Sequence, residues 1–231
     1  MNEQTGTFYA VSVGPGDPEL LTLKTVRLLE QLPVIAAPQT VSGQMLALDI
    51  ARAAVDLTGK TILPLLFTMS HDPAVRAASY RAAAAQLEAE LRQGRDVAMV
   101  NLGDVALYAT AYYILEQVRA DGFKTVMLPG VTSVSAVAAR LGWSLTEMEQ
   151  PLHILPASAD LDAALALSGT KVLMKSGSAI HETVAALGRA GLLSRAAMVA
   201  DCGLPTEQVY CDLRALPESV SYFATILVRS E

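Results

Sequence analysis

Three segments of the sequence combine glycine with polar side chains, and each directly follows a stretch that we predict to be a strand. They are residues 13–22 with Gly14-Pro15-Gly16, residues 101–108 with Gly103-Asp104, and residues 128–135 with Pro129-Gly130. Glycine lets a ligand approach the main chain closely, and open α/β sheets bind ligands at the carboxyl ends of their strands. If the three strands are parallel neighbours, the segments converge on one edge of a sheet.

The first segment matches neither of the common phosphate-binding loops. A Walker A loop needs a Gly-Lys-Ser/Thr sequence, which is absent, and a dinucleotide fingerprint needs a third glycine or alanine where Glu19 stands. Two interpretations remain open from the residues alone. The segment is an ordinary turn between a strand and a helix, or it is a ligand-binding loop at the end of a strand.

The second and third segments carry polar groups suited to a charged small molecule. Asp104 places a carboxylate that can accept hydrogen bonds from an amine or a ribose and attract a sulfonium, or it serves as the N-cap of the next helix. The third segment opens a helix, whose free N–H groups favour an anion such as a carboxylate. The alternative there is simple capping by Thr132 or Ser133.

Other common chemistries lack support. The three histidines, His71, His153 and His181, are scattered without the spacing of a metal site, so we predict no protein-bound metal. His181-Glu182 lacks the second histidine of a zinc-protease helix, and there is no Gly-x-Ser-x-Gly elbow. Nothing in the sequence points to a Ser/His/Asp triad.

The elements that would position these segments alternate between strands and helices. In the first half we predict strands at residues 7–13, 34–37 (closed by Pro38), 61–66 and 96–102, and helices at 23–32 (with Thr22 as N-cap), 45–55, 73–93 and 107–120. In the second half we predict a helix at 133–141 and strands at 125–128, 153–155, 171–174, 196–200, 208–212 and 222–228. Helices separate the early strands but not the last three, which predicts a mainly parallel first sheet and a mixed second sheet. We therefore predict an α/β protein with two domains, 1–120 and 121–231, divided at the Asp121-Gly122 turn.

The composition restricts the partners. The 231 residues are 52% hydrophobic and carry 17 basic and 23 acidic side chains, a net charge of −6, which argues against nucleic acid as a partner. No apolar run is long enough to span a membrane, and the first seven residues lack a signal pattern. Cys202 and Cys211 do not make a disulfide framework, although the sequence leaves one disulfide open. We predict a cytoplasmic protein.

Together the three segments resemble the tetrapyrrole methylase family, over nearly the whole chain from Phe8 to Arg229. The most specific signature is the run Gly-Pro-Gly-Asp-Pro-Glu-Leu-Leu-Thr-Leu-Lys at residues 14–24, and the segments at Gly103 and Pro129 follow in the family's order. The resemblance implies two α/β domains with S-adenosyl-L-methionine in the cleft between them, a tetrapyrrole substrate and a homodimer.

Within the family, residues 63–72, 107–113, 128–141, 154–157 and above all 222–229 resemble the branch that methylates C(20) of precorrin-2 or cobalt-factor II in cobalamin (vitamin B12) biosynthesis. The chain departs from the usual pattern at Val105 (usually proline), at Ala224 (often serine) and at Val131-Thr132 (usually isoleucine-serine). Two alternatives remain open: a sibling methyltransferase acting on another position of a corrin precursor, and a non-catalytic protein that binds a tetrapyrrole or an adenosyl ligand.

The resemblance also implies roles for individual residues. It assigns cofactor binding to Leu102, Asp104, Leu107, Thr132, Ser133 and Met174, the last of which is alternatively an ordinary core methionine. It assigns substrate binding to Pro15, Phe67, Met69, His71 and Asp72. Candidate cations for the substrate carboxylates, or else solvated surface charges, are Lys24, Arg76, Arg81, Lys175 and Arg229. The sequence identifies no general base.

Overall fold

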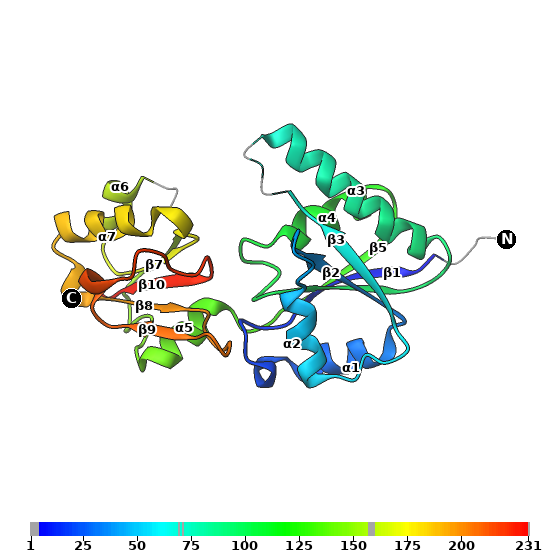
Figure 1. Cartoon of the computed structure of the whole chain (residues 1–231), viewed down its shortest axis with the longest axis horizontal. Coiled ribbons are helices and arrows are strands. Elements are labelled where there is room, and N and C mark those ends of the chain that lie inside the picture. The colour runs from blue at the N-terminus through cyan, green and yellow to red at the C-terminus, as the bar shows by residue number, and fades with distance from the viewer. Residues whose placement is uncertain (1–4, 69, 71, 157–159, 231) are drawn as a thin grey trace. The chain divides into compact units, whose positions relative to one another are not determined.

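The computed structural model describes residues 5–68, 70, 72–156 and 160–230, which form two compact units, Met1–Thr132 and Ser133–Glu231 (Figure 1). The division follows Thr132 and not the Asp121-Gly122 turn. The reason is that the strand after this turn pairs with the first strand of the chain and so completes the first sheet. The turn itself only ends a helix, with Gly122 in the left-handed region at φ 90°.

Unit 1 contains a five-stranded sheet in which every pairing is parallel, in the order β3-β2-β4-β1-β5. The strands are β1 (Thr7–Ser12), β2 (Val34–Gln39), β3 (Thr61–Leu66), β4 (Val97–Asn101) and β5 (Lys124–Leu128). The strand β2 continues through Pro38, where we predicted it to end. Proline is tolerated there because β2 pairs with β4 only as far as Ala36, while beyond it Pro38 faces Leu65 of β3.

Helices cover both faces of this sheet, with α1 and α2 on one face and α3 and α4 on the other (Figure 1). Their bounds are α1 (Leu23–Gln31), α2 (Leu46–Ala54), α3 (Pro73–Leu91) and α4 (Thr110–Ala120), with a 3-10 turn η1 (Pro18–Leu20) before α1. Thr22 caps α1, as predicted, because its hydroxyl accepts from Thr25 N at 3.1 Å. The helix predicted from residue 107 begins only at Thr110, since Tyr108 adopts a left-handed conformation at φ 52°.

Unit 2 contains the predicted mixed sheet, in the order β6-β7-β10-β8-β9. Its strands are β6 (Leu152–Pro156), β7 (Thr170–Met174), β8 (Ala196–Ala200), β9 (Gln208–Tyr210) and β10 (Ala224–Val228). Only β6 and β7 are parallel among these pairs. The helices are α5 (Ser133–Leu141) on one face and α6 (Leu161–Leu165) and α7 (Ile180–Arg189) on the other, with 3-10 turns η2 (Gly177–Ala179), η3 (Leu193–Arg195) and η4 (Leu213–Ala215).

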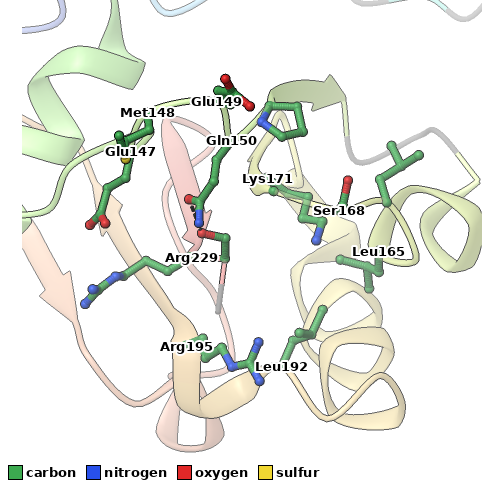
Figure 2. Close-up of a pocket in the computed structure, with 14 residues that line it drawn as sticks. Glu147, Met148, Glu149, Gln150, Leu165, Ser168, Lys171, Leu192, Arg195 and Arg229 are labelled. Atoms are coloured by element: carbon green, nitrogen blue, oxygen red, sulfur yellow. Dashed lines mark hydrogen bonds between the residues drawn. The ribbon is translucent and has the colours of Figure 1, made fainter.

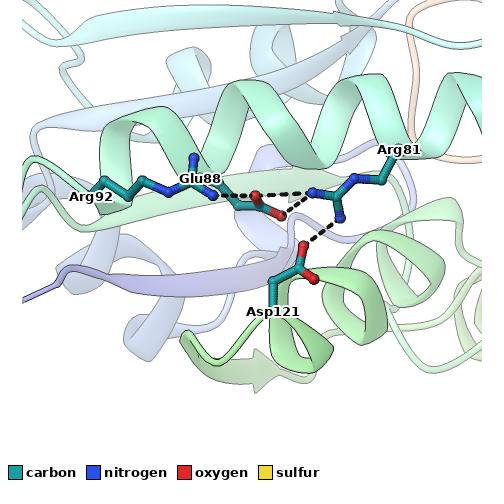
Figure 3. A network of polar contacts seen from close by, with 4 residues as sticks. All are labelled: Arg81, Glu88, Arg92 and Asp121. Carbon is teal, nitrogen blue, oxygen red and sulfur yellow. Dashed lines mark hydrogen bonds and ion pairs between the residues drawn. The ribbon is translucent and has the colours of Figure 1, made fainter.

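A buried carboxylate joins α3 to the turn that leads into β5 (Figure 3). The side chain of Glu88 is only 1% exposed and accepts hydrogen bonds from Arg92 at 2.8 Å and from Arg81 at 3.1 Å. Arg81 also pairs with Asp121, and this contact lowers the pKa of the Asp121 carboxyl. The network therefore holds the C-terminal half of α3 against the end of α4 and satisfies a charge that would be costly to bury alone.

Candidate functional site

The ends of β1, β4 and β5 form a continuous edge in unit 1, because these strands are adjacent and parallel. Two main-chain hydrogen bonds join the first two loops beyond the strands. Val13 N donates to Asn101 O at 3.0 Å, and Gly103 N donates to Gly14 O at 2.7 Å. The glycine-containing segments predicted to converge are thus in direct contact.

A buried serine that sequence reasoning missed holds the three strand ends together. Ser12 is the last residue of β1; its hydroxyl donates to Leu128 O at 2.7 Å and accepts from Val105 N at 3.0 Å. Gly130 packs so closely against this side chain that a Cβ added to Gly130 would lie 2.5 Å from Ser12 Cβ. The only signal in the sequence is a small polar residue inside an apolar strand.

Asp104 connects the second loop to the third. One carboxylate oxygen, Oδ1, accepts from Ala106 N at 2.8 Å, and the other, Oδ2, accepts from Gly130 N at 2.7 Å. Asp104 is therefore not the N-cap of α4, a position that Ala109 occupies. A carboxylate has about four acceptor positions. This half-buried side chain keeps acceptor capacity beyond its two bonds to main-chain N–H groups.

The other residues of unit 1 predicted to hold the cofactor lie on the same edge. Leu102 and Leu107 are half-buried in the β4–α4 loop, and Thr132 is half-buried after β5. Gly103, at φ 74°, has open space where a side chain would be, so the main chain of the loop is accessible from that side. The edge thus combines accessible backbone, apolar side chains and one carboxylate.

The residues predicted to contact the substrate differ in how far they are exposed to solvent. Pro15 is buried and offers little surface, whereas Phe67 is half-buried. Asp72 is exposed and caps α3, with its carboxylate accepting from Ala74 N at 2.8 Å. Met69 and His71 lie outside the described residues.

Phe67, just after β3, belongs to a group of aromatic side chains whose other members lie on α3 and α4, and which sequence reasoning only partly identified. Its ring meets that of Tyr80 edge to face at 6.1 Å, and Tyr80 stacks on Tyr113 at 5.5 Å with an interplanar angle of 11°. Tyr112 completes the group, with its ring 6.1 Å from that of Tyr113. Tyr112 and Tyr113 are 45% and 56% exposed, so unit 1 presents aromatic side chains to solvent.

In unit 2, Met174 ends β7 beside Pro156 of β6 and Thr225 of β10, and it is half-buried instead of enclosed in the core. The chain then turns through Lys175, at φ 59°. Two exposed aromatic side chains, Tyr222 and Phe223, lie just before β10 with ring centroids 5.4 Å apart. This end of the sheet therefore presents apolar and aromatic surface next to Met174.

Two of the proposed carboxylate-binding cations are placed elsewhere. Arg81 is bound to Glu88 and Asp121 in the network described above. Arg229 follows β10, which is antiparallel to β7, and so lies at the opposite end of the sheet from Met174. Its guanidinium stacks on Trp143, 5.2 Å from the ring centroid.

The cysteines are both free, so the disulfide that the sequence left open is not formed. Burial, with Glu207 close by, raises the pKa of the Cys202 thiol to about 11. Within the described ranges, no group of three His, Cys, Asp or Glu side chains is arranged to hold a metal ion. Nor does any described helix combine the length and apolarity needed to cross a membrane.

Known proteins match the chain over most of its length. Residues 7–217 match the family model of Tetrapyrrole (Corrin/Porphyrin) Methylases. A cobalt-precorrin-2 C(20)-methyltransferase of Salmonella typhimurium is 34% identical over 98% of this chain and 97% of its own. A precorrin-2 C(20)-methyltransferase of Sinorhizobium sp. is 30% identical over 96% and 95%, respectively.

Solved structures share the fold at lower identity. A cobalt precorrin-4 methyltransferase superimposes with a TM-score of 0.76 at 22% identity, covering 96% of this chain and 94% of its own. A uroporphyrin-III C-methyl transferase from Thermus thermophilus, in complex with S-adenyl homocysteine, gives 0.69 at 21% identity over 96% and 97%. With the family model spanning most of its length, the chain belongs to the tetrapyrrole (corrin/porphyrin) methylase family.

Proposed function

We propose that the protein is an S-adenosyl-L-methionine-dependent methyltransferase that methylates C(20) of precorrin-2 or of its cobalt-containing counterpart (cobalt-factor II) in cobalamin biosynthesis. The observation that carries the proposal is that relatives named for this reaction match the chain from end to end, at 30% and 34% identity. They leave the metal content of the substrate open, because one is named for the cobalt form and the other is not.

The loop edge of unit 1 fits the methyl donor. Accessible main chain at Gly103, with Leu102 and Leu107 beside it, suits close contact with a flat adenosyl group. The start of α5, with Thr132 and Ser133, suits the carboxylate of the methionine portion, because free N–H groups at a helix start favour an anion. When bound, S-adenosyl-L-methionine supplies a methyl group made electrophilic by its sulfonium.

The protein's own contribution is alignment. Asp104 is oriented by the N–H groups of Ala106 and Gly130, so its remaining lone pairs have a fixed direction toward donors or positive charge. The bonds of Ser12 fix the spacing of the three loops. Such preorganisation favours an in-line transfer, for which the acceptor carbon must be held in position. In unit 2, we propose that Met174 contacts the adenosyl group.

The aromatic surface of unit 1 is a second element of the proposal. A tetrapyrrole is a large, flat and partly conjugated ligand, and exposed aromatic rings provide rigid apolar area for it. We propose that Phe67, Tyr112 and Tyr113 contact one face of the macrocycle. We assign no general base to the loss of the proton at C(20).

The setting of the enzyme is likewise proposed by analogy with its family. We propose a cytoplasmic homodimer that acts on a free small molecule and not on nucleic acid. The net charge of −6 supports the last point. A tetrapyrrole with several carboxylates would then need local cations, so its binding should weaken as salt is added.

The direct test is product formation under anaerobic conditions. Purified protein would be incubated with S-adenosyl-L-methionine and precorrin-2, with and without cobalt, and the products followed by mass spectrometry. Addition of one methyl group at C(20) to either form supports the proposal, and the preferred form identifies the substrate. Methylation at another position would identify a sibling enzyme, and binding of both ligands without turnover would identify a binding protein.

The donor site is tested separately by isothermal titration calorimetry with S-adenosyl-L-methionine. Asp104→Asn should weaken binding by about tenfold, because it removes a charge and turns an acceptor toward Gly130 N–H into a possible donor. Asp49→Asn, at an exposed position of α2, is the matched control and should leave binding unchanged. Equal affinity of both variants would remove Asp104 from the site.

A further inference from the structure

A pocket of about 770 Å³ lies within unit 2, at the end of the sheet away from Met174 (Figure 2). The strand β7 runs from one end of the sheet to the other, with Lys171 near its start and Met174 at its end. The pocket is lined at its base by Lys171, and around it by residues of the loop before β6 and of the loop after α6. It is large enough for a small organic ligand. Apart from Arg229, which the sequence offered as a candidate cation for the substrate carboxylates, none of the residues assigned to the methyl donor or the tetrapyrrole lines it.

The base of the pocket is a buried cation. Lys171 is only 5% exposed and lies on the sheet face that α6 and α7 cover, yet in the part of the chain that the structure describes no acceptor pairs with its ammonium. Figure 2 shows the side chain directed into the pocket, toward Ser168 and Leu165. Burial, together with the charge of Arg195, lowers the pKa of Lys171. A buried ammonium without a partner is unfavourable, so its retention at the base of an open pocket needs an explanation.

Two further cations line the same pocket. Arg195 lies at the end of η3, and its carbonyl accepts from Arg229 N at 3.0 Å, which brings the two arginines to one wall. Arg229 is held in place by its stacking on Trp143. Arg195 is close enough to lower the pKa of Lys171, so an anion bound at the base of the pocket would favour the charged form of this lysine.

The acidic residues of the pocket do not neutralise its base. Glu147 and Glu149 lie on the loop before β6 and are exposed at the rim. Figure 2 shows both carboxylates away from the ammonium of Lys171. The remaining lining includes Leu165, Leu167 and Leu192, which would face the apolar part of a ligand.

We propose that this pocket binds a small organic or inorganic oxyanion, with phosphate or carboxylate groups on Lys171, Arg195 and Arg229. The site is independent of the proposed methyl transfer. Carboxylate and phosphate both pair with Lys and Arg through charge-assisted hydrogen bonds, so the oxyanion is the feature recognised.

The test is calorimetric titration of the full chain with inorganic pyrophosphate and, separately, with citrate, at constant ionic strength set with chloride. Neither experiment needs the methyl donor or a tetrapyrrole, so the result does not depend on the proposed function. Lys171→Gln should weaken binding at least about tenfold, while Lys171→Arg should retain it. The matched control is Lys124→Gln, which removes an exposed lysine from unit 1.

Saturable binding of either anion that is lost in Lys171→Gln supports the site, and the preferred anion distinguishes a phosphate ligand from a carboxylate ligand. Absence of binding by both anions at millimolar concentration would overturn the proposal, as would equal affinity of Lys171→Gln and Lys124→Gln. If Lys171→Gln does not fold, as judged by circular dichroism, Arg229→Gln provides the same test at an exposed position.

Discussion

The close approach of Gly130 to Ser12 gives the sharpest test of how the loop edge is built. Adding one methyl group in Gly130→Ala places a Cβ 2.5 Å from Ser12 Cβ, far inside van der Waals contact. Neither atom can rotate away, because both are attached directly to the main chain. The end of β5 must therefore move away from β1, which also lengthens the bond from Gly130 N to Asp104 Oδ2. The backbone of Gly130 lies outside the left-handed region, so the effect comes from the contact alone.

Overpacking of this kind costs about 1–3 kcal/mol of unfolding free energy, or a decrease in Tm of about 2–12 °C for a chain of this size. Binding of S-adenosyl-L-methionine should weaken by about tenfold or more, because the displaced loops carry the proposed contacts. Circular dichroism melting and calorimetric titration measure the two effects. A Gly188→Ala control in α7, where the nearest atom is the end of the Leu193 side chain at 3.4 Å, should not lower the Tm, because alanine favours a helix more than glycine does, and should leave donor affinity unchanged.

A double-mutant cycle separates the contact from other causes. Ser12→Gly alone is destabilising, because Val105 N and Leu128 O lose their common partner. It also removes the Cβ that Gly130→Ala strikes, so the double variant should be about 1–3 kcal/mol more stable than the sum of the single effects predicts. Strict additivity would refute the steric argument, as would a Gly130→Ala variant with wild-type Tm and donor affinity.

Three further predictions concern other parts of the chain. Glu88→Gln should lower the free energy of unfolding by about 1–3 kcal/mol, which is less than for a fully buried pair because both arginine partners are about half exposed. The control Glu116→Gln, at an exposed ion pair, should lower the free energy of unfolding by less in the same thermal melt. Iodoacetamide at pH 8 should modify Cys211 and spare Cys202, as peptide mapping would show, because the folded-state pKa of Cys202, about 11, is above the ordinary thiol value. The stability that the protonated Cys202 thiol contributes is present at neutral pH and is lost as the pH rises through about 11, which thermal melts at alkaline pH measure. Tyr113→Leu should raise the KM for the tetrapyrrole without changing donor affinity, whereas Tyr113→Phe should behave as the wild type; equal kinetics of the two variants would remove the ring from the proposed substrate surface.

Local signals were sufficient to predict where the strands lie, although some ends differ, such as that of β2, which continues through Pro38. A buried parallel strand is a short apolar run, and a glycine after it marks the turn, as at Val13-Gly14 and Leu102-Gly103. Thr22 was identifiable as a cap because its type and its place before a helical pattern are both local. Order along the chain also predicted which sheet is parallel, since helices separate the strands of unit 1 but not the last strands of unit 2.

Features that depend on pairing between distant segments were not predictable in this way. Membership of β5 in the first sheet is decided by its partner β1, more than a hundred residues earlier, and no local pattern records that pairing. The role of Ser12 likewise depends on two loops that the chain reaches much later. The pairing of Arg81 was recognisable from the sequence, because Glu88 stands seven residues further along α3, two helical turns away on the same face.

One departure from the family pattern has a physical effect at this edge. Val105 stands where the family usually has proline after Gly-Asp, and proline has no main-chain N–H to donate. Here the N–H of Val105 donates to Ser12 Oγ at 3.0 Å, within a buried group that also binds the main chain beyond β5. A chain with proline at this position cannot form that bond and must hold the loop by the fixed φ of the ring instead. In this protein a hydrogen bond takes over the positioning that proline would supply, so the sequence departs from the family pattern while the loop can keep its conformation.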